Sequence, residues 1–364
     1  MEPLRKVIAF FEDLFPSSLA LPEDRVGFHI HAKNTVERVL VALELNPQVL
    51  SKALECSCDL LYLHHPPLWE PLQKLSCEDP LFVMLEKLYD RGTSVFVHHT
   101  NLDIAPQGIA DQLLKLLGFE GNTKPLLTTA RPGKYKIVTF VPPTHLDVVL
   151  DALFQEGAGI VGNYRDCAFF VPGVGTFLPG EEARPFIGIP GRRERVEEIR
   201  IEVEVPSTKL SRAVQALEAT HPYEQPVIDV YQLTSIPLTY GLGRTVNLPT
   251  PLSEEEVRER IAHLSIPFSF ICTEKNVAFQ KIALCPGSGR KLVPKVIEER
   301  ADLFITGDLT HHDIETLRLF GIAYLCIPHG YGERLALREI ASLLRREAQK
   351  RSMAIDILFE EGIQ

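Results

Sequence analysis

Apolar and polar positions along the N-terminal third of the chain repeat with two different periods. Apolar and β-branched runs at 38–45, 59–67 and 93–103 predict strands, and amphipathic stretches at 47–56 and 79–92 predict helices. Strands that alternate with helices indicate a mainly parallel sheet with helices on both faces. We therefore expect functional side chains at the carboxyl ends of these strands.

The pattern changes after Gly118. Residues 122–136 are rich in Thr, Pro and Lys without a period, which predicts a linker. The next elements are a strand, a helix, a glycine-rich irregular span through Gly191, a strand, a helix and a strand. This is the split βαβ order of a ferredoxin-like α+β unit. The regular elements are expected at 135–143, 144–159, 196–206, 207–222 and 227–235.

From about residue 236 strands and helices alternate again. We therefore expect an α/β protein with an α/β half at 1–125, an inserted ferredoxin-like α+β domain at 126–235 and a second α/β half at 236–364. Both halves carry histidines where strands end, which suggests that they face each other across one site. The expected helices of the last part are at 253–264, 290–300, 313–321 and 331–351, and its strands at 281–287, 301–308, 322–330 and 354–360.

Composition and charge exclude several classes of protein. The 364 residues include 45% hydrophobic and 24% charged residues, as in ordinary globular proteins. The net charge is -10 without a block of Lys or Arg, so nucleic acid is not an expected partner. No run approaches the roughly 18 apolar residues of a membrane span, and the N-terminus does not resemble a signal peptide. We expect a cytoplasmic protein without a membrane contact.

Two adjacent histidines end the second expected strand. His64 and His65 are followed by Pro66 and Pro67, so the chain must leave the sheet in a rigid extended turn. In a strand the two rings would lie on opposite sides of the backbone, so each could reach a different ion of a metal pair. The alternative is two exposed polar residues at a strand end.

A second histidine pair follows the next strand, with a carboxylate close behind it. Asp103 could bridge two cations, although it could also cap a helix that begins near Gly108. His98 and His99 are expected to contact a substrate or to orient a metal ligand. His99 is our candidate for a catalytic proton shuttle, and His98 is the candidate substrate contact.

His329 and Glu333 lie four residues apart where a strand leads into the long C-terminal helix. This spacing lets both side chains converge on one point. Glu333 could instead only complement the helix dipole. Together with the strand-end residues they complete a set of five nitrogen and oxygen ligands, which suits Zn, Mn, Fe or Co. We expect two divalent cations, with Zn as the first candidate.

Further polar residues follow the strands near 287 and 307. Asp308 and His311 are candidate substrate contacts, and His312 is a second candidate proton shuttle. A capped helix start, with Asp308 as the cap, would require the same residue types. Ser288 lies in a Gly-Ser-Gly turn whose free N–H groups could hold an anion, although an ordinary tight turn needs the same residues.

Five segments in this order resemble one known family, the Nif-three-like dinuclear-metal family, whose members carry the name GTP cyclohydrolase I type 2 homologue. The middle part, at 156–180 and 220–233, resembles the insert of the long bacterial members, which is similar to PII and CutA proteins. The five segments are LLYLHHPPLW (60–69), VHHTNLDIAPQGIAD (97–111), IALCPGSG (282–289), DLFITGDLTHHD (302–313) and PHGYGE (328–333).

The resemblance implies a division of roles among the ligands. His64 and His65 would bind the two metals separately, Asp103 would be a further ligand, and His329 and Glu333 would complete the site. Glu333 would be the bridge, in place of Asp103. The resemblance also implies a homohexameric toroid whose metal sites face an internal cavity.

The implied function is that of a metal-dependent hydrolase in which metal hydroxide attacks a nucleotide such as GTP or another small phosphorylated ligand. The alternative is a metal carrier or sensor whose PII-like insert responds to a small molecule. The chain departs from the family at 23–28, where the usual Trp-Asp-Asn-x-Gly-Leu reads Glu-Asp-Arg-Val-Gly-Phe. The substrate range is the property that this departure puts in doubt.

Overall fold

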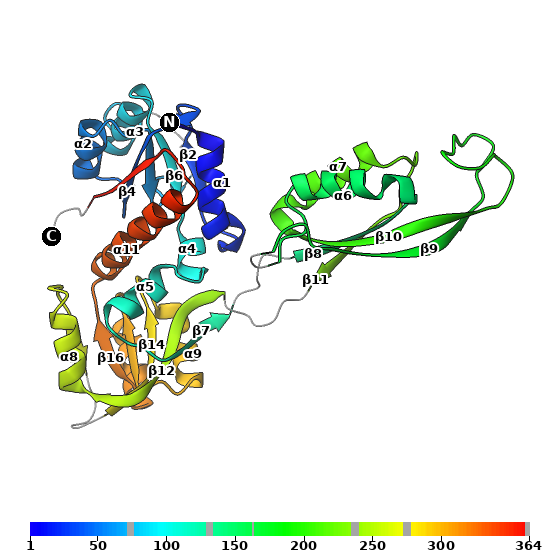
Figure 1. Cartoon of the computed structure of the whole chain (residues 1–364). Helices are drawn as coiled ribbons and strands as arrows, with labels where there is room; N and C mark the ends of the chain where they lie inside the picture. Colours follow the sequence, from blue (N-terminus) through cyan, green and yellow to red (C-terminus); the bar gives the residue numbers. More distant parts are fainter. Residues whose placement is uncertain (71–75, 129–133, 162–163, 234–239, 272–277, 361–364) are drawn as a thin grey trace. The chain divides into compact units, whose positions relative to one another are not determined.

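The protein is mixed α/β and forms two compact units. The structure is a computed structural model that describes residues 1–70, 76–128, 134–161, 164–233, 240–271 and 278–360. The first unit combines Met1–Ala130 with Leu238–Gln364, and the second comprises Arg131–Pro237 (Figure 1). Among the described helices, none is both long and apolar enough to cross a membrane.

The first sheet has the strand order β17-β4-β5-β6-β2. Its parallel centre confirms the strands expected in the N-terminal part, and β5 and β6 are completely buried. Helices α2 and α3 begin at Asn46 and Asp79, which accept backbone N–H groups and are each followed by a proline. The elements are β2 (Gly27–Ile30), β4 (Arg38–Ala42), α2 (Pro47–Glu55), β5 (Leu60–Leu63), α3 (Pro80–Asp90), β6 (Ser94–Val97) and β17 (Asp356–Phe359).

The second sheet has the order β13-β16-β15-β14-β12-β7, with β14, β15 and β16 parallel. Helices α8 and α10 both start with a capping box, at Ser253 and Thr310. The elements are β7 (Asn122–Thr128), β12 (Gly241–Ser253), α8 (Glu254–Ala262), β13 (Ser269–Ile271), β14 (Ala278–Cys285), α9 (Val293–Glu298), β15 (Leu303–Thr306), α10 (His311–Leu319) and β16 (Ala323–Cys326).

Helix α11 (His329–Lys350) connects the five-stranded and the six-stranded sheet of the first unit. It follows β16 of the second sheet and leads to β17 of the first sheet, and Figure 1 shows it between them beside α5 (Ile109–Leu116). One core cluster contains apolar residues of both sheets, of α11 and of α1 (Leu4–Leu14). Each sheet therefore combines strands from both parts of the chain. The C-terminal strand β17 joins the first sheet, and β7 from the N-terminal part joins the second.

Three expectations from the sequence differ from the structure. Residues 122–128 form β7 instead of a linker, because they pair antiparallel with β12, which is far away in the sequence. Residues 168–177 form β9 within the expected irregular span, where mostly exposed side chains remove the apolar alternation. The end of the strand expected at 93–103 is the short helix α4 (Thr100–Ile104).

The second unit is a four-stranded antiparallel sheet with the order β11-β8-β10-β9 and two helices. Apolar residues of α6, α7, β8 and β10 form its own core. The elements are β8 (Lys134–Val141), α6 (Leu146–Gln155), β9 (Ala168–Phe177), β10 (Glu194–Pro206), α7 (Leu210–Thr220) and β11 (Ile228–Leu233).

Candidate metal centre

Both histidine pairs leave the first sheet at the same edge. Strands β5 and β6 are parallel and Leu63 pairs with Val97, so the residues that follow each strand are neighbours. The backbone N–H of His98 still donates to the carbonyl of Leu63 at 3.1 Å, which extends the pairing by one residue. The placement at strand ends that the sequence predicts is confirmed.

The rings of His64 and His65 lie on the same side of the chain. Their centroids are only 5.1 Å apart, so the expected placement on opposite sides of the backbone is wrong. Strand β5 ends at Leu63, and the regular alternation of a strand does not continue through the pair. Both rings therefore reach one cluster of side chains.

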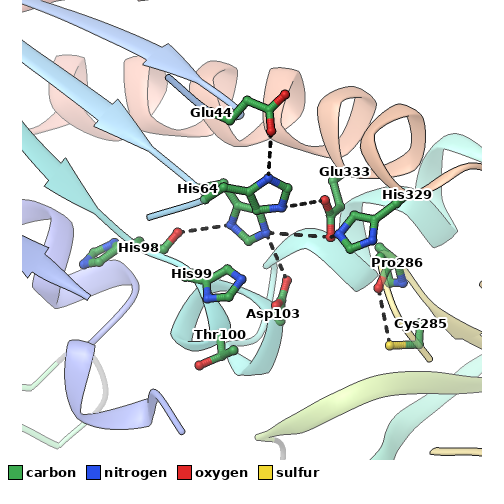
Figure 2. A network of polar contacts seen from close by, with 12 residues as sticks. Glu44, His64, His98, His99, Thr100, Asp103, Cys285, Pro286, His329 and Glu333 are labelled. Carbon is green, nitrogen blue, oxygen red and sulfur yellow. Dashed lines mark hydrogen bonds and ion pairs between the residues drawn. The ribbon is translucent and has the colours of Figure 1, made fainter. Parts of the chain in front are cut away.

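His64 is completely buried, and one of its ring nitrogens is free for a ligand role. Its Nδ1 donates to the carbonyl of His98 at 3.1 Å, which leaves the lone pair on Nε2. Nε2 lies 3.6 Å from Asp103 Oδ1 and has no hydrogen-bond partner among the described residues (Figure 2). Burial lowers the pKa of His64 to about 3, so the ring is neutral at pH 7.

Glu333 is the centre of the cluster (Figure 2). Its side chain is 5% exposed, and its two oxygens lie near three imidazole rings. Oε2 is 3.0 Å from Nε2 of His65, while Oε1 is 3.3 Å from Nε2 of His329 and 4.0 Å from Nε2 of His64. Burial opposes ionisation, but the close His329 and His65 rings outweigh it and hold the pKa of Glu333 well below its usual range, although Oε2 has no partner with hydrogen-bond geometry among the described residues. The group is a carboxylate.

The outer ring nitrogens of two histidines face carboxylates. Nδ1 of His329 lies 2.6 Å from Asp308 Oδ2, and Nδ1 of His65 lies 3.5 Å from Glu44 Oε2. Burial disfavours a charged His65 ring, but hydrogen bonds to Glu333 and Glu44 outweigh burial and raise its pKa to about 10. The hydrogen bond to Glu333 is the main reason that the pKa of His329 rises to about 9. Histidines that bind metal typically have a carboxylate at their other ring nitrogen, as His65 and His329 do here.

Asp103 enters the cluster from the first turn of α4. Its side chain is 25% exposed and lies 3.6 Å from His64. Burial, followed by the negative charge of Glu333, raises the pKa of Asp103 to about 7. Two carboxylates that repel each other beside a neutral imidazole favour a cation between them.

The donor atoms fit metal ions. Two groups have ligand atoms within 4.8 Å of one another, namely His64, His65 and His99, and His65, His329 and Glu333. Ligands bound about 2.0 to 2.1 Å from one zinc ion lie roughly 3 to 4 Å apart, which is the range of the distances around Glu333. Imidazole and carboxylate donors suit Zn, Mn, Fe or Co and do not choose among them.

His99 joins the cluster and His98 does not. The His99 ring centroid is 5.2 Å from that of His64, and its Nδ1 lies 2.7 Å from Asp24 Oδ1. His98 is completely buried, with Nδ1 3.0 Å from the Tyr62 hydroxyl and Nε2 3.2 Å from Glu12. The His98 side chain is therefore a hydrogen-bonded part of the core, and it is not the substrate contact that the sequence suggests.

The other predicted rim residues have different positions. Asp308 is paired with His329 at 2.6 Å, so it fixes the orientation of the His329 ring. Ser288, His311 and His312 are exposed, and no hydrogen bond or ion pair within the described part of the chain joins their side chains to the cluster. Thr310, and not Asp308, caps α10.

The Gly-Ser-Gly turn packs directly against Glu333 and His329. A Cβ atom at Gly287 would lie 2.2 Å from Glu333 Oε1 and 3.1 Å from His329 Nε2, and its φ is +68°. The carbonyl of Gly287 accepts the N–H groups of Gly307 and Asp308 at 2.9 and 3.2 Å. A tight turn beside the site explains this motif without an anion.

Comparison with known proteins identifies the family. The family Duf34/NIF3 (NGG1p interacting factor 3) matches residues 3–363. The chain belongs to the Duf34/NIF3 family. A relative from Halalkalibacterium halodurans, named GTP cyclohydrolase 1 type 2 homolog, is 35% identical over 308 residues, which are 84% of this chain and 82% of the relative. The Bacillus subtilis protein of the same name is 29% identical and covers 98% of this chain and 96% of its own.

Solved structures agree with this assignment to the Duf34/NIF3 family. A Bacillus cereus protein related to NIF3 matches with a TM-score of 0.82 and 29% identity, over 99% of this chain and 96% of that one. A Staphylococcus aureus protein matches with a TM-score of 0.74 and 26% identity, over 100% and 97% of the two chains. The resemblance inferred from the five sequence segments is confirmed.

Two residues of the site, and a third that holds His98 outside it, were not found from the sequence. Glu44 follows the end of β4, which neighbours β5, so the rule that located His64 could also have located it. Asp24 lies in the segment that departs from the family, and it keeps the Asp of the usual Trp-Asp-Asn. Glu12 is on the first helix, and nothing in the sequence connects it with His98.

Proposed function

We propose that this Duf34/NIF3 protein is a metal-dependent hydrolase with a dinuclear centre. The observation that supports the proposal is the position of Glu333, a buried carboxylate beside three imidazoles. His64 and Asp103 would hold one cation, His65 and His329 the other, and Glu333 would join them. Two divalent cations, Zn first and Mn, Fe or Co as alternatives, would supply Lewis-acid charge and a water activated at neutral pH.

Three side chains near the proposed metal ions would have separate roles in the reaction. Glu44 and Asp308 hold the His65 and His329 rings by their outer nitrogens. His99 would accept and return a proton beside the cluster. The substrate class that we infer is a nucleotide or another small phosphorylated compound. The name of the relatives, GTP cyclohydrolase 1 type 2 homolog, makes GTP the first compound to test.

The proposal is tested with the full-length protein. Metal is removed with a chelator and then restored as Zn or Mn, and turnover of GTP and a panel of phosphate esters is measured. We expect turnover that depends on metal and is lost in Glu333→Ala. Glu347→Ala, on the same helix and paired with Lys350 at the surface, is the matched control. Equal turnover by the wild type and Glu333→Ala would contradict the proposal.

We further propose the family architecture for this chain. Two α/β halves would share the metal site, and the unit at 131–237 would be a PII/CutA-like insert, which its antiparallel order and two helices support. Six chains would assemble into a toroid. Light scattering after size exclusion should then give six times the chain mass of 40.9 kDa, and a monomer would contradict this assembly.

A second candidate function is a regulatory binding protein. It is favoured by a cavity of about 800 Å³ in the second unit, separate from the metal residues. Its lining includes Phe140, Phe186 and Tyr223 together with Glu198 and Arg200. If a small molecule there controls metal release, zinc retention should change when a metabolite mixture is added, without any turnover. Turnover that depends on Glu333 would favour the hydrolase.

A further inference from the structure

We propose that Asp24 is a positioning residue that holds His99 in one orientation and one tautomer. The inference rests on the proposed hydrolase function, because it assigns a purpose to His99 in that reaction. Asp24 belongs to the segment between the first helix and the first sheet, far from every predicted ligand in the sequence. In the fold it lies directly behind the His99 ring.

The Asp24 carboxylate accepts hydrogen bonds at both of its oxygens. Its side chain is 1% exposed. Oδ1 lies 2.7 Å from Nδ1 of His99 and accepts the backbone N–H of Arg25 at 2.8 Å, while Oδ2 accepts the backbone N–H of Thr100 at 2.9 Å as well as its hydroxyl. Because each oxygen already accepts a backbone N–H, the group is an ionised carboxylate, which can only accept. Nδ1 of His99 must therefore carry a proton and donate it.

The other nitrogen of His99 is consequently left with its lone pair. The ring lies 5.2 Å from the His64 ring and 5.8 Å from the His65 ring, between centroids. His99 also shares a group of possible ligand atoms with these two residues. Since Nδ1 is engaged by Asp24, Nε2 is the atom that can take a proton from an attacking water beside the cluster.

A second contact fixes the ring from another side. Trp69 meets the His99 ring edge-on, with centroids 5.8 Å apart and an interplanar angle of 89°. The carbonyl of Trp69 accepts Nε of Arg25 at 3.0 Å. Asp24 and Arg25 are adjacent, so one short segment holds both the ring and the residue that packs against it.

Helix capping alone does not account for Asp24. Oδ2 accepts from Thr100 at the start of α4, whereas Oδ1 also contacts His99. In Asp24→Asn the amide NH₂ must face one backbone N–H, that of Arg25 or that of Thr100, because each oxygen of Asp24 accepts one of them. Where the NH₂ takes the place of Oδ1, Nδ1 of His99 must accept, and its proton moves to Nε2. The Nδ1–H tautomer is then no longer the sole one.

The first test is independent of turnover. Full-length protein is labelled with ¹⁵N-histidine, and ring nitrogen shifts are recorded with and without Zn. Signals that disappear in His99→Gln belong to His99. We expect Nδ1–H alone in the wild type and a fraction of Nε2–H in Asp24→Asn. Thr100→Ala, which removes a contact of the same carboxylate without touching Oδ1, should keep Nδ1–H. Nε2–H in the wild type would overturn the inference.

The second test uses turnover of the substrate found in the hydrolase screen. Asp24→Asn should lower kcat about 10- to 100-fold with bound zinc per chain unchanged. The double variant with His99→Gln should be no slower than the slower single variant, because Asp24 acts through His99. Independent, multiplying effects, or an equal loss in Thr100→Ala, would show a structural role only. If the wild type hydrolyses nothing, the proposed function fails, while the tautomer measurement still decides the role of Asp24.

Discussion

The Oε2 atom of Glu333 lies 3.0 Å from Nε2 of His65, although one residue is on α11 and the other follows β5. The contact joins the C-terminal helix to the edge of the first sheet. Because the Glu333 side chain is 5% exposed, water cannot replace its partners. The residues that form the centre are therefore also expected to affect the stability of the first unit.

Replacement of Glu333 by Gln should destabilise the metal-free protein. The change removes the buried negative charge of Glu333, which faces the protonated rings of both His65 and His329. We expect the free energy of unfolding to fall on the order of 3 kcal/mol, measured by urea unfolding at pH 7 with a chelator present. Glu347→Gln breaks only a surface pair with Lys350 and should change it by less than about 0.5 kcal/mol. Equal stability of the two variants would be inconsistent with this view of the cluster.

Zinc affinity should rise with pH. The pKa of His65 is raised to about 10 and that of His329 to about 9, so both rings are protonated at pH 7 and must lose a proton to bind metal. Near pH 8, where Asp103 with its pKa of about 7 is mostly ionised, the affinity should rise about 100-fold per pH unit, measured by competition with a chelator. Calorimetry at this pH in two buffers should show about two protons released, and about one in His329→Ala. An affinity that does not change with pH would contradict the assignment.

Gly287→Ala should disturb the centre without changing any ligand. The new Cβ would lie 2.2 Å from Glu333 Oε1, and φ of +68° disfavours a side chain. We expect zinc affinity to fall at least about 10-fold, measured by the same competition. Gly180→Ala is a suitable control, because nothing lies within 4 Å of its Cβ position. Unchanged affinity in Gly287→Ala would mean that the turn can move away.

Arg244 should contribute to stability and not to metal binding. Its guanidinium is buried, pairs with both oxygens of Asp111 at 2.7 and 2.9 Å, and donates to the carbonyl of Ala105. Lys cannot reproduce this planar pattern, so Arg244→Lys should cost about 3 kcal/mol in urea unfolding, with zinc bound per chain unchanged. Arg318→Lys, in an exposed pair with Glu315, should have little effect. Loss of zinc in Arg244→Lys would contradict this separation.

Much of the site could be predicted from local patterns. Apolar runs between helices predicted the parallel strands, and parallel strands place their carboxyl ends at one edge, so the histidine pairs were expected there. The spacing of His329 and Glu333 predicted that both converge at the start of the C-terminal helix, which in the structure begins at His329 itself. These predictions succeed because the period of a strand or helix depends on residues close together in the chain.

Other features depend on contacts between distant segments. The sequence does not show which of His98 and His99 faces the core, because this is determined by the contacts of Tyr62 and Glu12 with one ring and of Asp24 with the other. The exchange of β7 and β17 between sheets depends on pairings with β12 and β4. The sequence by itself determined most of the elements and the residue types that gather at the candidate site. Only the tertiary structure decided which carboxylate meets three imidazoles, because burial and charge at Glu333 arise from segments that meet only after folding.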